Sequence, residues 1–396
     1  MNKALHLRGM RATATAVASM LLLIMAGVAR ADQATQESGN TNANTLDPVQ
    51  PSPYGKPAAP PTGHQGEWVI APIPGYGPSQ GFSLAVVGQY IYKPEGQSES
   101  TPPTTLGLAG AYTQQDSHIV GAGYRGSLAD DNWRFLAGVG SGQYNFDFYG
   151  VGSVASKVDV HVPIQQSFDA LFIQATRRFA PQVYLGPRLI ATKIKMSLGA
   201  LTPPVAANYA SLFSQELSDV ALGLRLLLDT RDNSFYPTTG RNTQSRVDWY
   251  RRSFGGDFNY QLFDAEYNQY FQHGRKNVIA ARIYMRYASG GAPFYALSTF
   301  GGTDLRGYDS DRYRDQALLA AQAEWRYTLS HRWAVVAFGG VGNVAPSFSK
   351  IGDAGLWSAG AGLRLRIAKD NPVNFRLDWA QGRDGSALYL SVGEAF

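Results

Sequence analysis

LLAAQAEWRYTL, residues 318–329, alternates between two kinds of side chain along its whole length. Every second residue is apolar: Leu319, Ala321, Ala323, Trp325, Tyr327 and Leu329. The residues between them are small or polar and include Glu324 and Arg326. A period of two places these sets on opposite faces of a β-strand. The stretch therefore predicts a strand with one apolar face and one face that carries charge.

The same alternation recurs in 356–368 and 373–380, whose polar faces carry Arg364, Arg366, Arg376 and Asp378. In a soluble sheet the apolar face points to a core, whereas in a transmembrane barrel it meets lipid and the charged face lines the lumen. The predicted strands run to ten residues or more, longer than the usual ~5–6 of soluble sheets. The chain also closes on an alternating strand, SALYLSVGEAF (386–396). These features favour the barrel.

The pattern predicts about sixteen strands, near residues 66–74, 80–93, 104–114, 117–127, 131–146, 164–178, 181–198, 217–230, 239–252, 257–272, 276–288, 317–329, 332–342, 355–368, 372–380 and 386–396. An even number suits a closed barrel, which leaves no unpaired sheet edge in lipid. Counted from the periplasm, the connections divide into short periplasmic turns at 273–276, 330–332 and 369–372 and long external loops at 146–163, 199–216 and 289–316. We therefore expect residues 66–396 to form an all-β, transmembrane antiparallel β-barrel of about sixteen strands.

The N-terminal 31 residues have the pattern of a secretory signal peptide. Three basic residues precede an apolar run at 14–28, and Ala29-Arg30-Ala31 is a small-x-small cleavage pattern. The run is too short for a membrane-spanning helix. Residues 32–65 are poor in apolar residues and rich in Pro, Asn, Thr and Gln, which predicts a disordered, Pro-rich periplasmic linker. We expect export to the cell outer membrane.

Composition argues against several classes of function. Residues 1–31 hold four of the 35 basic residues and none of the 30 acidic ones, so 31 face 30 in the remainder. That balance does not favour a nucleic-acid partner. There are no cysteines, and the six histidines are scattered without metal-ligand spacing. Since no nucleophile, base and orienting group occur together, we predict no enzyme activity, no metal and no cofactor.

The long loop at 289–316 contains GGTDLRGYDSDRYRDQ (301–316) and is too long for a simple hairpin connection, which indicates a function. With the strand that follows, it resembles the sixth external loop and twelfth strand of the BamA/TamA outer-membrane assembly superfamily, the bacterial surface antigen barrels. The Arg-Gly-aromatic motif of that loop is matched by Arg306, Gly307 and Tyr308. In the family the loop folds back into the lumen, where acidic residues of the neighbouring strands hold its arginine.

The resemblance implies that this loop is a latch, a brace inside the barrel made by the Arg306-Gly307-Tyr308 tip. A guanidinium in a lumen is costly unless it is paired and hydrogen-bonded. Glu324 faces the lumen on the next strand, so we predict an Arg306–Glu324 pair. Gly307 is expected to turn the backbone sharply, and Tyr308 to pack against the wall. The alternative is a mobile surface loop with an incidental arginine.

Two departures from the family pattern matter. The family usually places an Asp on the thirteenth strand, in a Phe-x-Asp-x-Gly pattern, to hold the same arginine. This chain has Gly340 there, between Phe338 and Gly342. The latch is then weaker, or a substitute acid acts, for which Asp378 and Asp248 are the candidates. The family's assembly factors also carry periplasmic repeat domains, and the 32–65 linker is too short to hold one.

Other stretches agree with the family in order and spacing. DTRDNSFYPTTGR (229–241) resembles a periplasmic turn of the family through Asp229, Arg231, Asp232, Pro237 and Gly240. Residues 355–380 resemble its penultimate hairpin, and 387–396 resemble its closing strand. The resemblance is strong over 217–396 and weaker over 66–216.

The junction of the first and last strands, called the seam below, is a second candidate site. In this superfamily these strands pair poorly and can separate, so that a client strand adds to the exposed edge. Pro72 and Pro74 in the first strand cannot donate to a ladder, and the last strand contains Gly393 and ends at Phe396. These residues either weaken the seam or merely end strands.

The resemblance implies a noncatalytic barrel that helps polypeptides to fold into, or pass through, the outer membrane. Its expected partners are outer-membrane lipid and lipopolysaccharide and an unfolded polypeptide client. In one alternative, the barrel needs a separately encoded periplasmic protein that supplies what the linker lacks. In another, it is a passive or partner-gated pore lined by Arg364, Arg366, Arg376, Asp378 and Glu324.

Overall fold

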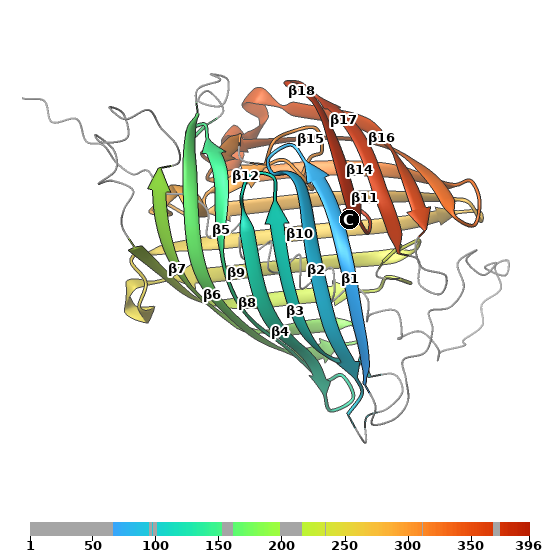
Figure 1. Ribbon diagram of the computed structural model, residues 1–396, viewed down its shortest axis with the longest axis horizontal. Helices are drawn as coiled ribbons and strands as arrows, with labels where there is room; N and C mark the ends of the chain where they lie inside the picture. Colours follow the sequence, from blue (N-terminus) through green and yellow to red (C-terminus); the bar gives the residue numbers. More distant parts are fainter. Residues whose placement is uncertain are drawn as a thin grey trace, which may run out of the picture.

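The computed structural model describes residues 66–94, 97, 101–152, 161–198, 216–233, 235–310, 312–366 and 373–396 (Figure 1). The predicted signal peptide (1–31) and linker (32–65) lie outside the described residues. The turn predicted at 369–372 and nearly all of the loop predicted at 199–216 also lie outside them. Within the described part of the chain, no helix is long and apolar enough to cross a membrane.

Sixteen strands of the described chain form one closed antiparallel barrel. They are β1 (Glu67–Gly77), β2 (Gly81–Tyr92), β3 (Thr104–Thr113), β4 (His118–Leu128), β5 (Trp133–Phe148), β6 (Val162–Ala180), β7 (Val183–Leu198), β8 (Glu216–Asp229), β9 (Gly240–Tyr250), β10 (Tyr260–His273), β11 (Asn277–Ala288), β14 (Ala317–Thr328), β15 (Trp333–Ala345), β16 (Leu356–Arg366), β17 (Asn374–Gly382) and β18 (Gly385–Val392). The predicted fold is confirmed, and each strand ends within four residues of the predicted position. Alternation alone located the wall.

The two faces of the wall follow the alternation of the sequence. On β14, Glu324 and Arg326 are buried on the inner face, whereas Trp325 between them is exposed on the outer face. Leucine, valine, isoleucine and aromatic side chains make up the exposed outer face of the other strands. Because the side-chain period is two, placing the Trp325 face of β14 toward lipid sends its charged residues, Glu324 and Arg326, into the lumen.

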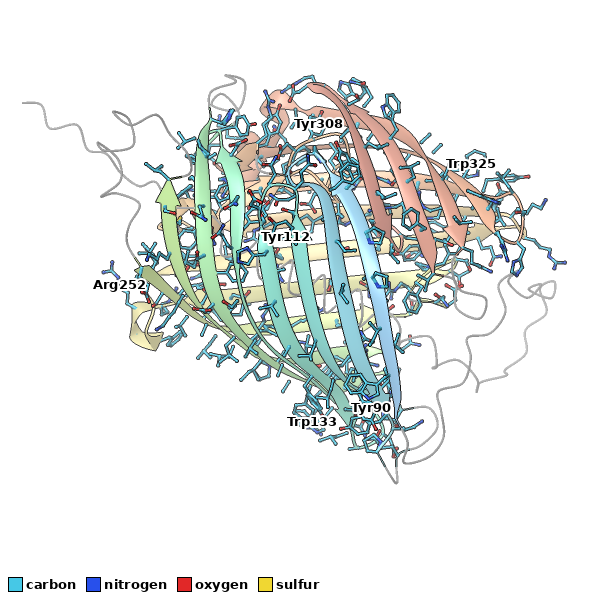
Figure 2. All side chains as sticks on the ribbon, in the orientation of Figure 1. Tyr90, Tyr112, Trp133, Arg252, Tyr308 and Trp325 are labelled. Atoms are coloured by element: carbon cyan, nitrogen blue, oxygen red, sulfur yellow. The ribbon has the colours of Figure 1, made fainter. Side chains whose placement is uncertain are left out.

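Aromatic side chains gather at one end of the barrel. The Trp68 and Tyr90 rings lie 5.2 Å apart at the start of β1 and the end of β2. Trp325 and Tyr327 lie at the corresponding end of β14, 5.7 Å apart. Figure 2 shows Tyr90 and Trp133 together at this end. Aromatic belts of this kind are typical of a membrane–water interface.

The wall has a tall side and a short side. β6 has 19 residues and β7 has 16. β17 has nine residues and β18 has eight. In Figure 1 the short red strands β16–β18 lie beside the blue β1, so the low side of the wall is also the side on which the barrel closes.

The loop between β11 and β14 has structure of its own. It contains a 3₁₀ turn, η4 (Phe294–Ala296), and a small hairpin of β12 (Ser298–Phe300) and β13 (Tyr313–Asp315). Its apolar side chains pack in one cluster with those of β14, β15 and β16: Phe300, Leu305, Tyr308, Tyr313, Leu318, Ala320, Val344 and Leu356. The loop therefore lies against the inner face of the wall. The 3₁₀ turns η3 (Arg252–Phe254) and η5 (Phe348–Ala354) lie in two other loops.

Candidate functional site

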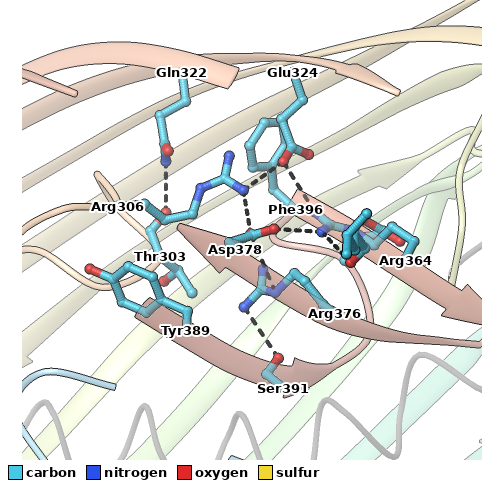
Figure 3. Close-up of polar contacts among 12 residues, drawn as sticks. Thr303, Arg306, Gln322, Glu324, Arg364, Arg376, Asp378, Tyr389, Ser391 and Phe396 are labelled. Atoms are coloured by element: carbon cyan, nitrogen blue, oxygen red, sulfur yellow. Dashed lines mark hydrogen bonds and ion pairs between the residues drawn. The ribbon is translucent and has the colours of Figure 1, made fainter. Parts of the chain in front are cut away.

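Arg306 lies at the tip of the loop and is only 1% exposed. Its Nη1 lies 2.7 Å from Glu324 Oε2 on β14 and 2.7 Å from Asp378 Oδ2 on β17 (Figure 3). Its guanidinium carbon lies 3.4 Å from the centroid of the Phe338 ring on β15. Two carboxylates and an aromatic face therefore surround one cation, which offsets the cost of burying it.

The position of Gly340, where the resemblance leads us to expect an acid, is filled by the loop. A Cβ at Gly340 would lie 2.6 Å from Leu305 Cδ1 and 2.6 Å from the Ala321 carbonyl oxygen. A Cβ at Gly342 would lie 2.6 Å from the Phe300 ring. In a close-packed interior such contacts leave no room for an aspartate at position 340. The glycine thus reflects a loop packed directly onto β15.

Asp378 supplies the second carboxylate instead, and it also binds Arg364 Nη1 at 2.5 Å. Gly362 faces Asp378 across the β16–β17 ladder, and a Cβ there would collide with the Asp378 carboxylate. The small residue on β16 therefore leaves the space in which Asp378 reaches both arginines. Sequence reasoning identified Asp378 as a substitute acid but not the glycine that makes room for it.

The prediction that Asp248 could also hold Arg306 is wrong. Its Oδ1 lies 3.1 Å from Arg188 Nε on β7. Gly223 of β8 lies between them in the ladder, opposite Asp248 on one side and Arg188 on the other. Alternation correctly predicts a lumen-facing side chain, but it does not say which part of the lumen wall that side chain meets. Asp248 belongs to the β7–β9 wall and not to the latch.

Glu324 connects the latch to a larger buried network. It binds Arg326 at 2.8 Å and lies 3.7 Å from Arg364, which binds Glu394 at 2.8 Å (Figure 3). All of these side chains are less than one-tenth exposed. Removing one member of such a network leaves an opposite charge buried without compensation, so its members depend on each other.

The next two residues of the tip bind the wall through hydrogen bonds. Gly307 has a φ of 103°, and a Cβ there would lie 3.0 Å from the Gly382 nitrogen, so both conformation and space require glycine. Its N–H donates to Tyr389 Oη at 2.9 Å. The Tyr308 hydroxyl donates to the Trp357 carbonyl at 2.6 Å. The tip is therefore tied to β18 and β16.

The seam contains one residue pair, Tyr76 with Leu390. Neighbouring strands elsewhere in the described barrel share at least eight pairs, as β3 and β4 do. Pro72 and Pro74, which have no N–H, lie on the part of β1 that has no residue pair with β18. The residues selected from the sequence therefore lie where the ladder is interrupted.

The last residues of the chain leave the wall at this point. Gly393 has a φ of 91°, and Glu394 and Phe396 beyond it are buried in the lumen. Glu394 binds Arg364, and the Phe396 carbonyl oxygen accepts a hydrogen bond from Arg326 at 2.9 Å. Since these residues bind the latch network, they are unavailable to continue β18 along β1.

The loop tip also contacts both sides of the seam. Ser79, in the turn after β1, donates to Asp309 Oδ1 at 2.7 Å and accepts from the Ser310 N–H at 3.0 Å. On the other side, the Tyr389 hydroxyl of β18 donates to the Tyr308 carbonyl at 3.2 Å. Side-chain contacts made by the loop thus bridge two strands that share one backbone pair.

The motif at 229–241, which we predicted to be a periplasmic turn, forms a compact structure between β8 and β9. Asp229 receives two hydrogen bonds from the Arg231 guanidinium, at 2.8 and 2.6 Å. Asp232 accepts the Thr238 N–H at 2.8 Å. Gly240 has a φ of 86°, which favours glycine. The motif residues therefore shape the turn.

Arg326 joins this turn to the latch, a role that the sequence did not predict. Its Nη1 donates to the Pro237 carbonyl at 3.4 Å, and its Nη2 binds both Glu324 and Phe396. The available signal was its position two residues after Glu324, on the same face of β14. Tyr389 and Ser79 carried no comparable signal, because their roles depend on where the loop tip lies.

Comparisons with known proteins agree with the barrel fold. The Omp85 superfamily domain matches residues 101–396. The fold is similar to BamA from Haemophilus ducreyi lacking POTRA domains 1–3, with a TM-score of 0.58 and 16% identity over 83% of this chain and 70% of that one. Similar structures include CdiB from Acinetobacter baumannii (TM-score 0.53, 13% identity, 82% and 58% of the two chains) and CdiB from Escherichia coli (0.53, 11%, 83% and 63%).

No curated protein sequence matches the chain. At these identities the solved structures show a shared fold and nothing finer. The aligned part is also less than two-thirds of either CdiB chain. The family match, in contrast, extends over about three-quarters of the sequence, from β3 to the last residue, and includes the loop, its arginine and the closing strand. The chain belongs to the Omp85 superfamily.

Proposed function

We propose that this chain is a noncatalytic outer-membrane barrel that helps polypeptides to fold into, or pass through, that membrane. The observation that carries the proposal is the seam, with its single residue pair. Unpaired backbone groups at a sheet edge are costly in lipid because water cannot satisfy them. An incoming strand would satisfy them by pairing with the edge, so the seam favours strand addition.

In the proposed orientation, the unpaired part of β1 lies toward the periplasmic end. β1 and β18 are antiparallel, so the Tyr76–Leu390 pair sets Ile73 opposite Gly393, where the chain turns inward. Residues 67–72 pair with β2 on one side and have no residue pair with β18 on the other. A client that arrives from the periplasm would meet this edge first.

The wall is also lowest at the seam. The outer face of β17 offers lipid Phe375, Leu377 and Trp379, and β18 offers Leu388 and Leu390. A transmembrane strand needs about 9–11 residues, and β18 has eight. A belt this short favours local thinning of the bilayer, which reduces the distance that a client must cross.

The loop latch controls this edge in the proposed mechanism. Its tip holds Ser79 on one side of the seam and Tyr389 on the other, while Arg306 anchors the tip to β14 and β17. The anchor keeps the rest of the barrel in shape when the two seam strands separate. Opening then needs only the single backbone pair and a few hydrogen bonds of the tip to break.

The test is a client-folding assay with a seam that can be locked. Purified protein is reconstituted in liposomes, an unfolded outer-membrane barrel is added, and the client's folded fraction is followed by its heat-modifiable gel mobility. Tyr76→Cys/Leu390→Cys places a disulfide across the seam, since directly opposed residues have suitable spacing and the chain has no other cysteine. We expect faster client folding than in empty liposomes, lost on oxidation and restored by reductant.

The matched control is Leu84→Cys/Tyr112→Cys, an opposed pair on the outer faces of β2 and β3. Oxidation there should leave client folding unchanged. No acceleration by the unmodified protein, at any client concentration, would overturn autonomous assistance and point to a barrel that needs a periplasmic partner. Acceleration that survives the locked seam would exclude the seam as the site. Ion conductance with an intact loop and no effect on the client would identify a pore.

A further inference from the structure

The 229–241 turn is held more firmly than a connection between two strands requires. Asp232 Oδ1 accepts the N–H groups of Thr238 and Thr239, at 2.8 and 3.0 Å. The Thr238 hydroxyl also donates to Gln272 Oε1 on β10, at 3.3 Å. Hydrogen bonds from one carboxylate to successive N–H groups fix a backbone path without help from a ladder. The end of the turn is therefore fixed in shape and fixed against β10.

This fixed end of the turn meets Arg326. The Tyr236 side chain is 2% exposed, and its ring centroid lies 5.6 Å from the Arg326 guanidinium carbon. The Pro237 carbonyl oxygen accepts a hydrogen bond from Arg326 Nη1 at 3.4 Å. Nη2 of the same guanidinium donates to the Phe396 carbonyl oxygen at 2.9 Å. One buried arginine therefore connects the turn to Phe396.

Residues 393–396, called the tail below, cross the lumen instead of continuing β18. Ala395 and Phe396 pack in one cluster with Tyr270 of β10 and Ala280 of β11. Around the barrel, β11 is the fifth strand from β18. The tail therefore reaches strands that β18 does not neighbour.

The tail would meet a poor partner if it continued β18 along β1. The register of the seam would place Glu394 opposite Pro72 and Ala395 opposite Ala71. Pro72 has no N–H to donate to the ladder. Glu394 would lie on the same face as Leu388, which is the lipid face, where a carboxylate is unfavourable. Because the paired position is weak, a few contacts inside the lumen can decide where the tail lies.

We propose that the 229–241 turn keeps the tail inside the lumen and thereby keeps the edge of β1 free. The turn positions Arg326, and Arg326 holds Phe396, while Arg364 binds Glu394 at 2.8 Å. When the turn releases Arg326, the tail pairs with β1 and closes the edge. The inference rests on the seam function proposed above and gives the turn a positioning role in it.

A disulfide that only the paired tail can form reports the position of the tail. Ala71→Cys/Ala395→Cys sets two thiols opposite each other when the tail continues β18, and the chain has no other cysteine. In liposomes, the full chain with these two substitutions should crosslink slowly on oxidation. Asp232→Ala removes the acceptor that shapes the turn, and it should speed crosslinking about fivefold, the effect of losing one hydrogen bond.

Two further substitutions test the turn without removing its acidic side chain outright. Asp232→Asn keeps an oxygen that accepts the Thr238 and Thr239 N–H groups, so it should restore the slow rate. Tyr236→Leu keeps a buried apolar side chain but removes the ring beside Arg326, so it should also speed crosslinking. Heat-modifiable mobility shows which variants have folded, and Tyr236→Leu carries the comparison if Asp232→Ala does not fold.

The matched control is Asp257→Ala in the loop between β9 and β10. It removes a carboxylate that accepts the Ser218 N–H at 2.6 Å, far from the tail in the ladder, and should leave the rate unchanged. An unchanged rate in Asp232→Ala and Tyr236→Leu would overturn the proposal. Crosslinking that is equally fast with the turn intact would also overturn it.

The crosslinked protein tests the seam function separately. With the tail bonded to β1, the edge is closed and acceleration of client folding should be lost, to return on reduction. Client folding that continues after complete crosslinking would contradict the seam function, while the crosslinking rates would still support the hold of the turn on the tail.

Discussion

Neighbouring strands are held together differently in the β5–β8 wall and at the seam. β5 and β6 share sixteen residue pairs, whereas β1 and β18 share one. In the wall, side chains are free to define a lipid surface because the backbone ladder supplies the connection. At the seam, contacts with the loop tip supply it: Ser79 beside β1 binds Asp309 of the loop, and Tyr389 of β18 accepts the Gly307 N–H. A continuous ladder opens only as a unit, but a set of separate side-chain contacts can be released stepwise.

This difference shows that a buried ion pair has a different role in each of the two regions. Arg188 and Asp248 pair between strands that are already held by long ladders, so their pair adds little to the connection of the wall. Arg306 joins a loop to two strands that do not neighbour each other, β14 and β17. The same chemistry is therefore structural reinforcement in one region and the main anchor in the other.

Arg306→Ala should have the largest effect. It removes the cation between Glu324 and Asp378 and leaves buried carboxylate charge, so the free energy of unfolding should fall by about 3–5 kcal/mol. Urea titrations in vesicles measure this, and client folding should be lost as well. Arg188→Ala is the matched wall variant, expected to lower stability while client folding is retained. Equal loss of client folding in both would erase the distinction between the two regions.

Gly340→Asp should have the next largest effect, although it places an acid where the resemblance leads us to expect one. The Cβ of the new side chain would lie 2.6 Å from Leu305 Cδ1, so overpacking should cost about 1–3 kcal/mol. Adding Leu305→Ala should recover part of that loss, as the two residues occupy the same space. Denaturant midpoints of the two single variants and the double variant measure the coupling. Stabilisation by Gly340→Asp alone would show that the loop has room to move.

The sequence predicted the features that depend on alternation or on closeness along the chain. Glu324 was found because it follows the loop directly and faces the lumen, and the sixteen strands followed from the period of two. Asp248 was misassigned, because alternation gives the face of a residue but not its height or its neighbours around the barrel. The β12–β13 hairpin was missed, since strands of three residues show no period. Arg326, Tyr389 and Ser79 depend on the path of the loop, which only the structure shows.

Ser79→Ala should have a smaller effect, confined to the seam. It removes the hydroxyl that binds Asp309 and Ser310, at a cost of about 0.5–1.5 kcal/mol. Hydrogen exchange of the β1 amides should quicken while that of β5–β8 stays unchanged. Ser127→Ala, which removes a hydroxyl bonded to Asp131 in the β4–β5 turn, is the control and should leave β1 exchange as it was. Faster exchange throughout the barrel would contradict the view that the Ser79 contact stabilises only the seam.

The contact between the loop and β11, made by Asp304, should make stability depend on pH, and this effect should be the smallest. Asp304 lies 3.3 Å from Arg282 on β11, and burial raises the pKa of its carboxyl to about 6 despite this partner. A raised pKa means that the folded state favours the protonated form. The contribution of Asp304 to stability is therefore complete below its ordinary pKa of 3.8 and is lost as pH rises through about 6.

Asp304→Asn should remove this dependence. It should change the free energy of unfolding at pH 7 by less than about 1 kcal/mol, because the Asp304 side chain is 21% exposed and solvent in the lumen screens its charge. The measurement is the difference in urea midpoint between wild type and variant at pH 4.5 and at pH 7, which cancels the titration of all other groups. Wild type should gain relative to the variant at the lower pH. A difference that is the same at both pH values would mean that Arg282 compensates fully for burial, and that the loop is held on this flank as firmly as a wall strand.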